Sequence, residues 1–131
     1  MAYTKTDWVD GTTAITAERL NKMEDGIARV HAGVVTFEAG PGWVASNGWG
    51  VARTEDANET YFTLTHDLGT TEYDIVAAST YGADHNIVDM VSIGVKAADT
   101  VQIAVARWER VAANNITTGP GGGCAFVLVL R

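Results

Sequence analysis

The residues best suited to chemistry are the three histidines and the carboxylates beside them. Imidazole and carboxylate groups bind a metal ion or transfer protons only where several of them converge. We expect His31 on a helix, His66 at a strand end and His85 in a loop, so nothing in the sequence brings them together. His66-Asp67 and Asp84-His85 are adjacent pairs, and neighbouring strand residues point to opposite faces. We therefore predict neither a metal centre nor a catalytic acid–base pair at these residues.

Motifs for other catalytic chemistry are missing from the sequence. It has no Gly-x-Ser-x-Gly elbow and no His-Glu-x-x-His run, and the triple glycine at 121–123 precedes a strand with no Lys after it. Cys124 is the single cysteine, so we expect no disulfide and no structural zinc, but a small buried apolar side chain. A glycosidase formed by carboxylates from distant loops stays open. The prediction is that the chain is not an enzyme and needs no cofactor.

The composition excludes two classes of partner. The net charge is −7 and the sequence has no basic cluster, which argues against nucleic-acid binding. No apolar run is long enough for a membrane span, and the N-terminus lacks the layout of a signal peptide. With 131 residues, we expect one domain with a short appendage.

From residue 61 onward the hydrophobic pattern has a period of two, in which Phe62 and Leu64 should point inward and the neighbouring threonines outward. The same alternation and β-branched content predict strands at 61–65, 73–79, 87–95, 101–105 and 125–130, with a long loop at 114–123. The last strand is apolar on both faces, so we expect it in the centre of a sheet or against another subunit. The sequence thus predicts a mainly β fold, with an antiparallel β-sandwich head over residues 35–131.

Two tryptophans, Trp43 and Trp49, lie in a glycine-rich segment at 39–50. The glycines indicate turns, and Asn47-Gly48 is a candidate type I′ hairpin connection. The two indole rings could form a platform on which a sugar ring stacks. The alternative is that they plug the end of the sandwich or lie between subunits.

A helix is predicted over residues 16–34. Thr16 is a suitable N-cap, Glu18 favours the positive end of the helix dipole, and Ile15 and Leu20 occupy the positions of a hydrophobic staple. An apolar seam follows at spacings of three and four residues, through Leu20, Met23, Ile27, Val30 and Val34. This is the a/d pattern of a coiled coil, which predicts association with identical partners. The alternative is a short helix packed on its own domain.

The polar arm at 1–15 is too short to bury a core of its own. Such a segment is either disordered or held by another chain. Tyr3 and Trp8 are its large aromatic side chains, and Trp8 is the residue that we expect to anchor it to a partner. The alternative is that Trp8 folds back on its own helix.

Two motifs in this chain are similar to segments of phage proteins. The run Trp8-x-x-Gly11, followed by Ile15-Thr-Ala-Glu-Arg-Leu-Asn-Lys-Met-Glu-Asp-Gly-Ile27, resembles the N-terminal segment of phage tail-fibre, baseplate and receptor-binding proteins. Thr65-His-Asp-Leu-Gly69, ahead of Tyr73-Asp-Ile-Val76, is similar to a turn in C-terminal β-domains of phage tail proteins. The first motif lies within roughly the first quarter of the chain.

The resemblance implies a homotrimer in the virion, most simply in the tail. The arm with Tyr3 and Trp8 would dock on other virion proteins, the helices would form a three-fold bundle lined by the seam residues, and the β heads would contact the host surface, often a saccharide. The chain is much shorter than a typical tail fibre, and it has no long shaft.

Three hypotheses follow for the function. A host-binding tail protein would present Trp43, Trp49 and Tyr81 as an exposed cluster. A capsid decoration or head-fibre protein with a structural role would bury them. An enzyme acting on surface glycans would need carboxylates meeting in a groove.

Overall fold

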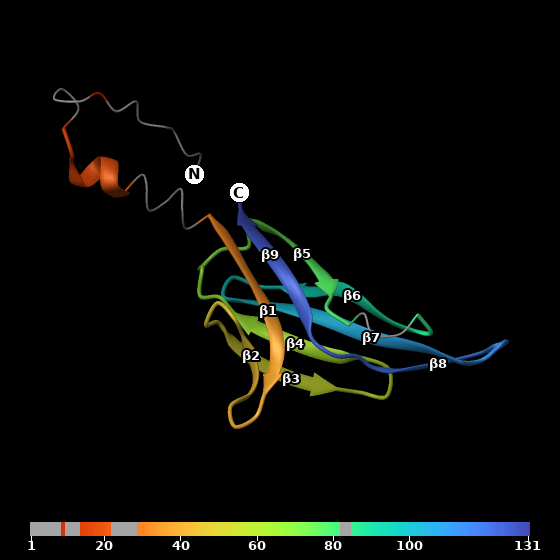
Figure 1. Cartoon of the computed structure of the whole chain (residues 1–131). Helices are drawn as coiled ribbons and strands as arrows, with labels where there is room; N and C mark the ends of the chain where they lie inside the picture. The colour runs from red at the N-terminus through yellow and green to blue at the C-terminus, as the bar shows by residue number, and fades with distance from the viewer. Residues whose placement is uncertain (1–8, 10–13, 22–28, 82–84) are drawn as a thin grey trace.

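A computed structural model describes residues 9, 14–21, 29–81 and 85–131, and within these ranges the protein is mainly β (Figure 1). The strands are β1 (Val30–Glu38), β2 (Gly42–Ala45), β3 (Gly50–Glu55), β4 (Thr60–Thr65), β5 (Tyr73–Ser79), β6 (Ile87–Lys96), β7 (Thr100–Ala112), β8 (Asn115–Pro120) and β9 (Cys124–Leu130). Antiparallel pairing arranges them in two sheets, ordered β2-β1-β9-β5 and β3-β4-β7-β6, with β8 joined to β7 in the second. The mainly β fold with antiparallel sheets, predicted from the alternation, is confirmed.

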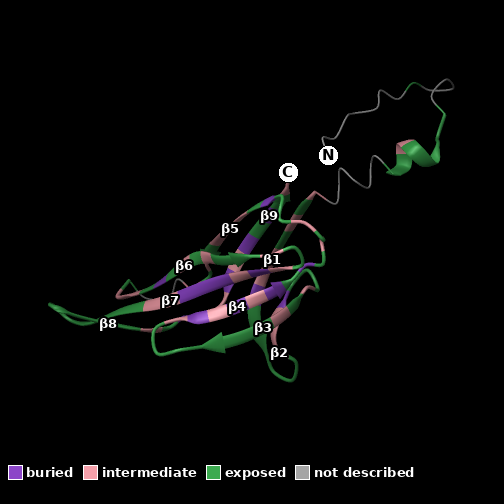
Figure 2. Ribbon diagram, turned by 180° about the vertical axis from the view of Figure 1, so that it is seen from behind, coloured by how far each residue is buried: buried purple, intermediate pink, exposed green. Residues whose placement is uncertain are grey.

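The two sheets share one hydrophobic core. Alternate residues of β4 and β9 are buried, as are Val101 and residues 103–105 of β7, and Figure 2 shows these three strands as the ones with the most buried residues. The first sheet contributes Val35, Tyr73, Cys124, Phe126 and Leu128, and the second contributes Phe62, Leu64, Val101, Ile103 and Val105. The expected inward positions of Phe62 and Leu64 and the burial of Cys124 are confirmed.

The expected strands agree with the observed ones except along β7. Four of them match β4, β5, β6 and β9 to within one residue at each end, and β9 has the central place predicted for it, between β1 and β5. The strand predicted at 101–105 extends to Ala112, and part of the predicted loop at 114–123 is β8. The hydrophobic pattern did not predict β8, because its residues are almost all exposed and include Gly and Pro. Its backbone pairs with the second half of β7, beyond the half that pairs with β4.

The Asn47-Gly48 turn is not a hairpin connection. It links β2 to β3, which belong to different sheets. The Gly48 N–H donates to the Ala45 carbonyl at 3.0 Å, and Gly48 has a φ of +86°. Neither Ser46 nor Asn47 has the positive φ that both central residues of a type I′ turn require, so the prediction was wrong.

The predicted start of the helix is present. Residues 17–21 are helical, and the Thr16 hydroxyl accepts a hydrogen bond from the Arg19 backbone N–H at 3.2 Å, which confirms Thr16 as the N-cap. Ile15 and Leu20, the expected staple pair, are both exposed. The seam residues Met23 and Ile27 and the arm residues Tyr3 and Trp8 lie outside the described residues.

The predicted helix does not extend to residue 34. Val30 and Val34 lie in β1, opposite Val129 and Ala125 of β9, so their placement in a coiled-coil seam was wrong. Non-local pairing with β9 satisfies the backbone of this β-branched segment, and no local spacing reveals that partner. A spacing of four residues fits one face of a helix and also one face of a strand, whose period is two.

Candidate functional site

Trp43 is a core-edge residue in the structure. Its ring lies 5.0 Å from that of Phe62 and 5.7 Å from that of Phe37 between centroids, and the Arg53 guanidinium lies over it at 5.3 Å. These contacts cover much of the indole surface that a sugar ring would need. Trp43 therefore closes an end of the core.

Trp49 fills the space between the sheets together with two histidines. It stacks on Phe126 at 5.3 Å and an interplanar angle of 16°, with His31 at 5.4 Å and His66 at 5.7 Å. The structure thus brings His31 and His66 to the same ring, which the sequence did not indicate, and it places His31 in β1, so the prediction of His31 on a helix was wrong. The His66 Nδ1 accepts a hydrogen bond from the Leu68 N–H at 3.1 Å, and the Nε2 atoms of both histidines are buried without a hydrogen-bond partner among the described residues.

A metal site would need further ligating side chains close to these two histidines. Across the described ranges, no group of three or more His, Cys, Asp or Glu side chains is placed to hold a metal ion. His85, the third histidine, is exposed in the turn before β6, as expected for a loop residue. The ring contacts of Trp49 with Phe126, His31 and His66 make this cluster a packed aromatic plug.

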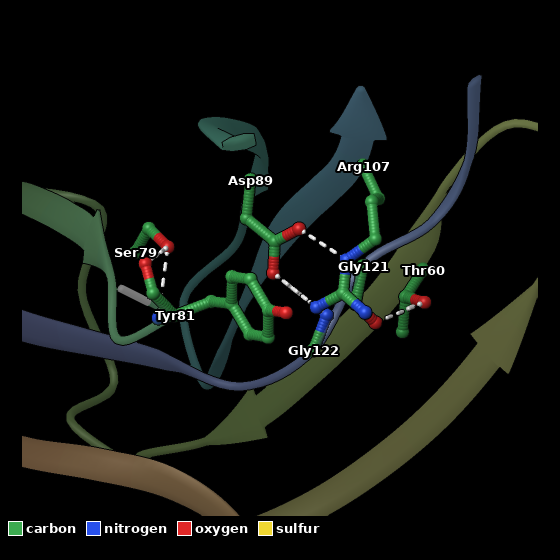
Figure 3. Close-up of polar contacts among 7 residues, drawn as sticks. All are labelled: Thr60, Ser79, Tyr81, Asp89, Arg107, Gly121 and Gly122. Carbon is green, nitrogen blue, oxygen red and sulfur yellow. Dashed lines mark hydrogen bonds and ion pairs between the residues drawn. The ribbon is translucent and has the colours of Figure 1, made fainter. Parts of the chain in front are cut away.

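Tyr81 lies against a salt bridge inside the second sheet (Figure 3). The Arg107 guanidinium stacks on the Tyr81 ring at 4.3 Å and donates to the Asp89 carboxylate from Nε at 2.7 Å and Nη2 at 3.0 Å. The Gly122 N–H also donates to Asp89, at 3.0 Å. Burial raises the pKa of Asp89, but these hydrogen bonds and the Arg107 charge outweigh it, so the pKa lies below its usual 3.8.

The salt bridge also fixes the glycine strap, residues 121–123, which carries the chain from β8 in the second sheet to β9 in the first. The Gly121 carbonyl accepts a hydrogen bond from the buried Thr60 hydroxyl at 3.0 Å, and the Gly121 N–H donates to the Val105 carbonyl at 3.1 Å (Figure 3 shows the Thr60 bond). A Cβ at Gly121 would overlap the Val105 side chain. The triple glycine therefore serves close packing.

The three aromatic residues expected to bind a ligand are therefore part-buried in three different settings: a core edge, an aromatic plug and a salt bridge. They do not form one exposed cluster. Two other aromatic residues on strands do face solvent: Phe37 of β1, whose ring lies edge-on to Trp43, and Trp108 of β7, a position that the sequence analysis did not single out. Trp108 is 43% exposed.

Trp108 stands between two hollows on the outer face of the second sheet. In the register of the strands it lies beside Val88 of β6 and Thr118 of β8. One hollow, of about 230 Å³, is lined by His85, Asn86, Val88, Trp108, Arg110 and Ile116. The other, of about 200 Å³, is lined by Glu59, Met90, Val91, Ser92, Ala106 and Trp108. We call this surface the Trp108 platform.

Polar groups border the platform at both ends. The Arg110 guanidinium donates to the Asn86 side-chain oxygen at 3.1 Å, and the Arg110 N–H donates to the Asn86 carbonyl at 2.8 Å, which holds the two side chains next to the first hollow. Glu59 and Ser92 line the second hollow. An apolar ring face with hydrogen-bonding groups around it suits a ligand that is apolar on one face and polar at its rim.

The salt bridge supports the platform from the inside of the sheet. Asp89 pairs with Arg107 in register, next to the pair formed by Val88 and Trp108. Since successive side chains alternate between faces, the inward ion pair holds the outward residues in place. The sequence carried little signal for Trp108: the hydrophobic alternation of Val101, Ile103 and Val105 stops there, since Arg107 takes the next inward position. Only the extension of β7 to Ala112 places Trp108 outward.

None of the helices in the described part of the chain is long and apolar enough to cross a membrane. Comparison of the chain with protein-family models, with curated proteins and with solved structures found no match.

Proposed function

We propose that the chain is a trimeric structural protein of a phage tail, a fibre, tip or receptor-binding protein, whose head binds saccharide on the host surface. The N-terminal segment with Tyr3 and Trp8 attaches it to other virion proteins. The resemblance of residues 8–27 to phage proteins supports the location, and the capped helix start at Thr16 is consistent with the trimerisation element.

The observation that carries the binding role is the Trp108 platform. A pyranose ring has an apolar face of C–H groups and a rim of hydroxyls, which matches an exposed indole with Asn86, Arg110, Glu59 and Ser92 beside it. The two hollows on either side of the ring give space for more than one sugar unit. In this proposal the saccharide is bound and no covalent bond of it is broken.

Trp108→Ala is expected to weaken saccharide binding about tenfold or more, because loss of an aromatic stacking contact costs roughly 1 kcal/mol beyond the lost area. The measurement is binding of the full chain to an array of bacterial surface saccharides, followed by titration of the best ligand. Val95→Ala is the matched control, an exposed apolar residue of the same sheet outside the platform. Absence of binding by the wild type, or equal binding by the two variants, would overturn the saccharide role.

The trimer is tested separately, by light scattering. The wild type should have the mass of three chains, and a Leu20→Asp, Ile27→Asp double variant that of one, since charges in an apolar seam are not tolerated. Asn21→Asp places a charge next to the exposed Leu20 but off the seam, and it should leave the mass unchanged. A monomeric wild type contradicts the trimer.

A capsid decoration or head-fibre protein is the second candidate. The observation in its favour is that Trp43, Trp49 and Tyr81 are packed within the fold rather than gathered on the surface. In that case Trp108→Ala changes no binding, and antibodies against the chain label the capsid rather than the tail of purified particles.

A further inference from the structure

The first sheet has an unusual outer face. On β1, β9 and β5 the side chains opposite one another form two aliphatic rows, Ala32–Val127–Val76 and Val34–Ala125–Ala78. We call these six residues the aliphatic face. None of them is fully buried, and Val76 is 67% exposed. A shallow hollow of about 200 Å³ lies over the part formed by β5 and β9.

Charge is confined to the border of this face. The next row is Val30–Val129–Asp74, in which Asp74 is paired with Arg131 at 3.5 Å. By contrast, a row on the outer face of the other sheet, Ala52–Thr63–Gln102, carries two polar side chains. An antiparallel sheet with one face in water normally carries polar residues on that face, whereas β9 is apolar on both. Contiguous exposed apolar surface of this kind marks an interaction site.

We infer that the aliphatic face packs against the same face of other copies of this chain, an inference that rests on the proposed trimer. Chain continuity points to that occupant: the predicted seam of Leu20, Met23 and Ile27 leads within three residues to Val30, where β1 begins. If three copies associate through the seam, β1 of each copy therefore begins close to the three-fold axis, at the same height along it. Ala32, Ala78 and Ala125 allow close approach of the strands.

Charge also favours a second copy. Each chain carries a net charge of −7, so two chains repel one another except through surfaces with little charge. The aliphatic face contains no ionisable side chain, so that repulsion is small there. Binding of a small amphiphilic ligand or of an unrelated protein would not require the face to be free of charge, whereas contact between two copies with a net charge of −7 does.

The test is thiol labelling of the native full chain with a maleimide. Val76→Cys places the probe on the aliphatic face, and Val95→Cys is the control on the other sheet, because the two positions are 67% and 68% exposed in the single chain. The native Cys124 is buried, and burial raises its pKa to about 11, so it stays silent until the chain is unfolded. We expect Val76→Cys to react at least tenfold more slowly than Val95→Cys.

The outcomes separate this inference from the proposals above. Equal labelling rates in a protein with the mass of three chains overturn the face as an interface and leave the trimer standing. The inference is supported if Val76→Cys is labelled slowly in the otherwise wild-type chain and as fast as Val95→Cys when Leu20→Asp and Ile27→Asp are also present. A monomeric wild type overturns both the interface and the trimer, while saccharide binding at Trp108 is decided by its own measurement.

Discussion

Gly123→Ala is expected to lower the free energy of unfolding by about 3 kcal/mol or more, since adding atoms to a close-packed site forces the backbone to move. A Cβ at this position would overlap the backbone carbonyl oxygen of Val35 and lie 3.2 Å from its carbonyl carbon. Val35 is fully buried and pairs with Ala45 on one side and Cys124 on the other. The β1 backbone therefore cannot retreat without disturbing both ladders.

The measurement is equilibrium unfolding in urea, followed by far-ultraviolet circular dichroism. Gly119→Ala is the matched control: a Cβ there meets no atom within 4 Å, and its φ is not in the left-handed region. We expect the control to change the free energy of unfolding by no more than about 0.5 kcal/mol. Equal stabilities of the two variants would show that the glycine strap is not packed against β1 as described.

The sequence predicted those strands whose alternation arises from burial in the core. Phe62 and Leu64 in β4 and the apolar residues of β9 alternate because one face of each strand lies against the opposite sheet. β8 lacks that signal, since its backbone pairs with β7 while its side chains remain exposed. Backbone pairing between distant segments leaves no mark on local periodicity, which is also why β1 was mistaken for the end of a helix.

The candidate site was less predictable than the fold. A tryptophan among glycines, such as Trp43 or Trp49, has the same local sequence whether it plugs a core or faces a ligand, because its surroundings come from other strands. The hydrophobic alternation from Val101 stops at Val105, because Arg107 takes the next inward position, so it did not reveal the outward Trp108. The hollows beside Trp108 could not be predicted either, since Glu59, Asn86 and Ile116 line them from three separate segments.

Asp89→Ala is expected to lower the free energy of unfolding by about 2–3 kcal/mol, because it removes the ionic partner of Arg107, whose side chain is itself 29% exposed and keeps part of its hydration. The Asp89 side chain is fully buried and accepts hydrogen bonds from Arg107 and Gly122, so the variant also loosens the strap. Glu55→Ala, in the exposed Arg53–Glu55 pair, is the control and should cost at most about 1 kcal/mol.

The pH dependence identifies the carboxylate as the source of this stability. The pKa of Asp89 in the folded state lies below 3.8, so its contribution is complete above that value and is lost as the pH falls through the folded-state pKa. The stability difference between wild type and Asp89→Ala should thus be constant from roughly pH 7 to 5 and shrink below about pH 4. A difference that stays unchanged at low pH would assign the effect to packing of the side chain, and the ion pair with Arg107 would then not be what holds β6, β7 and the strap together.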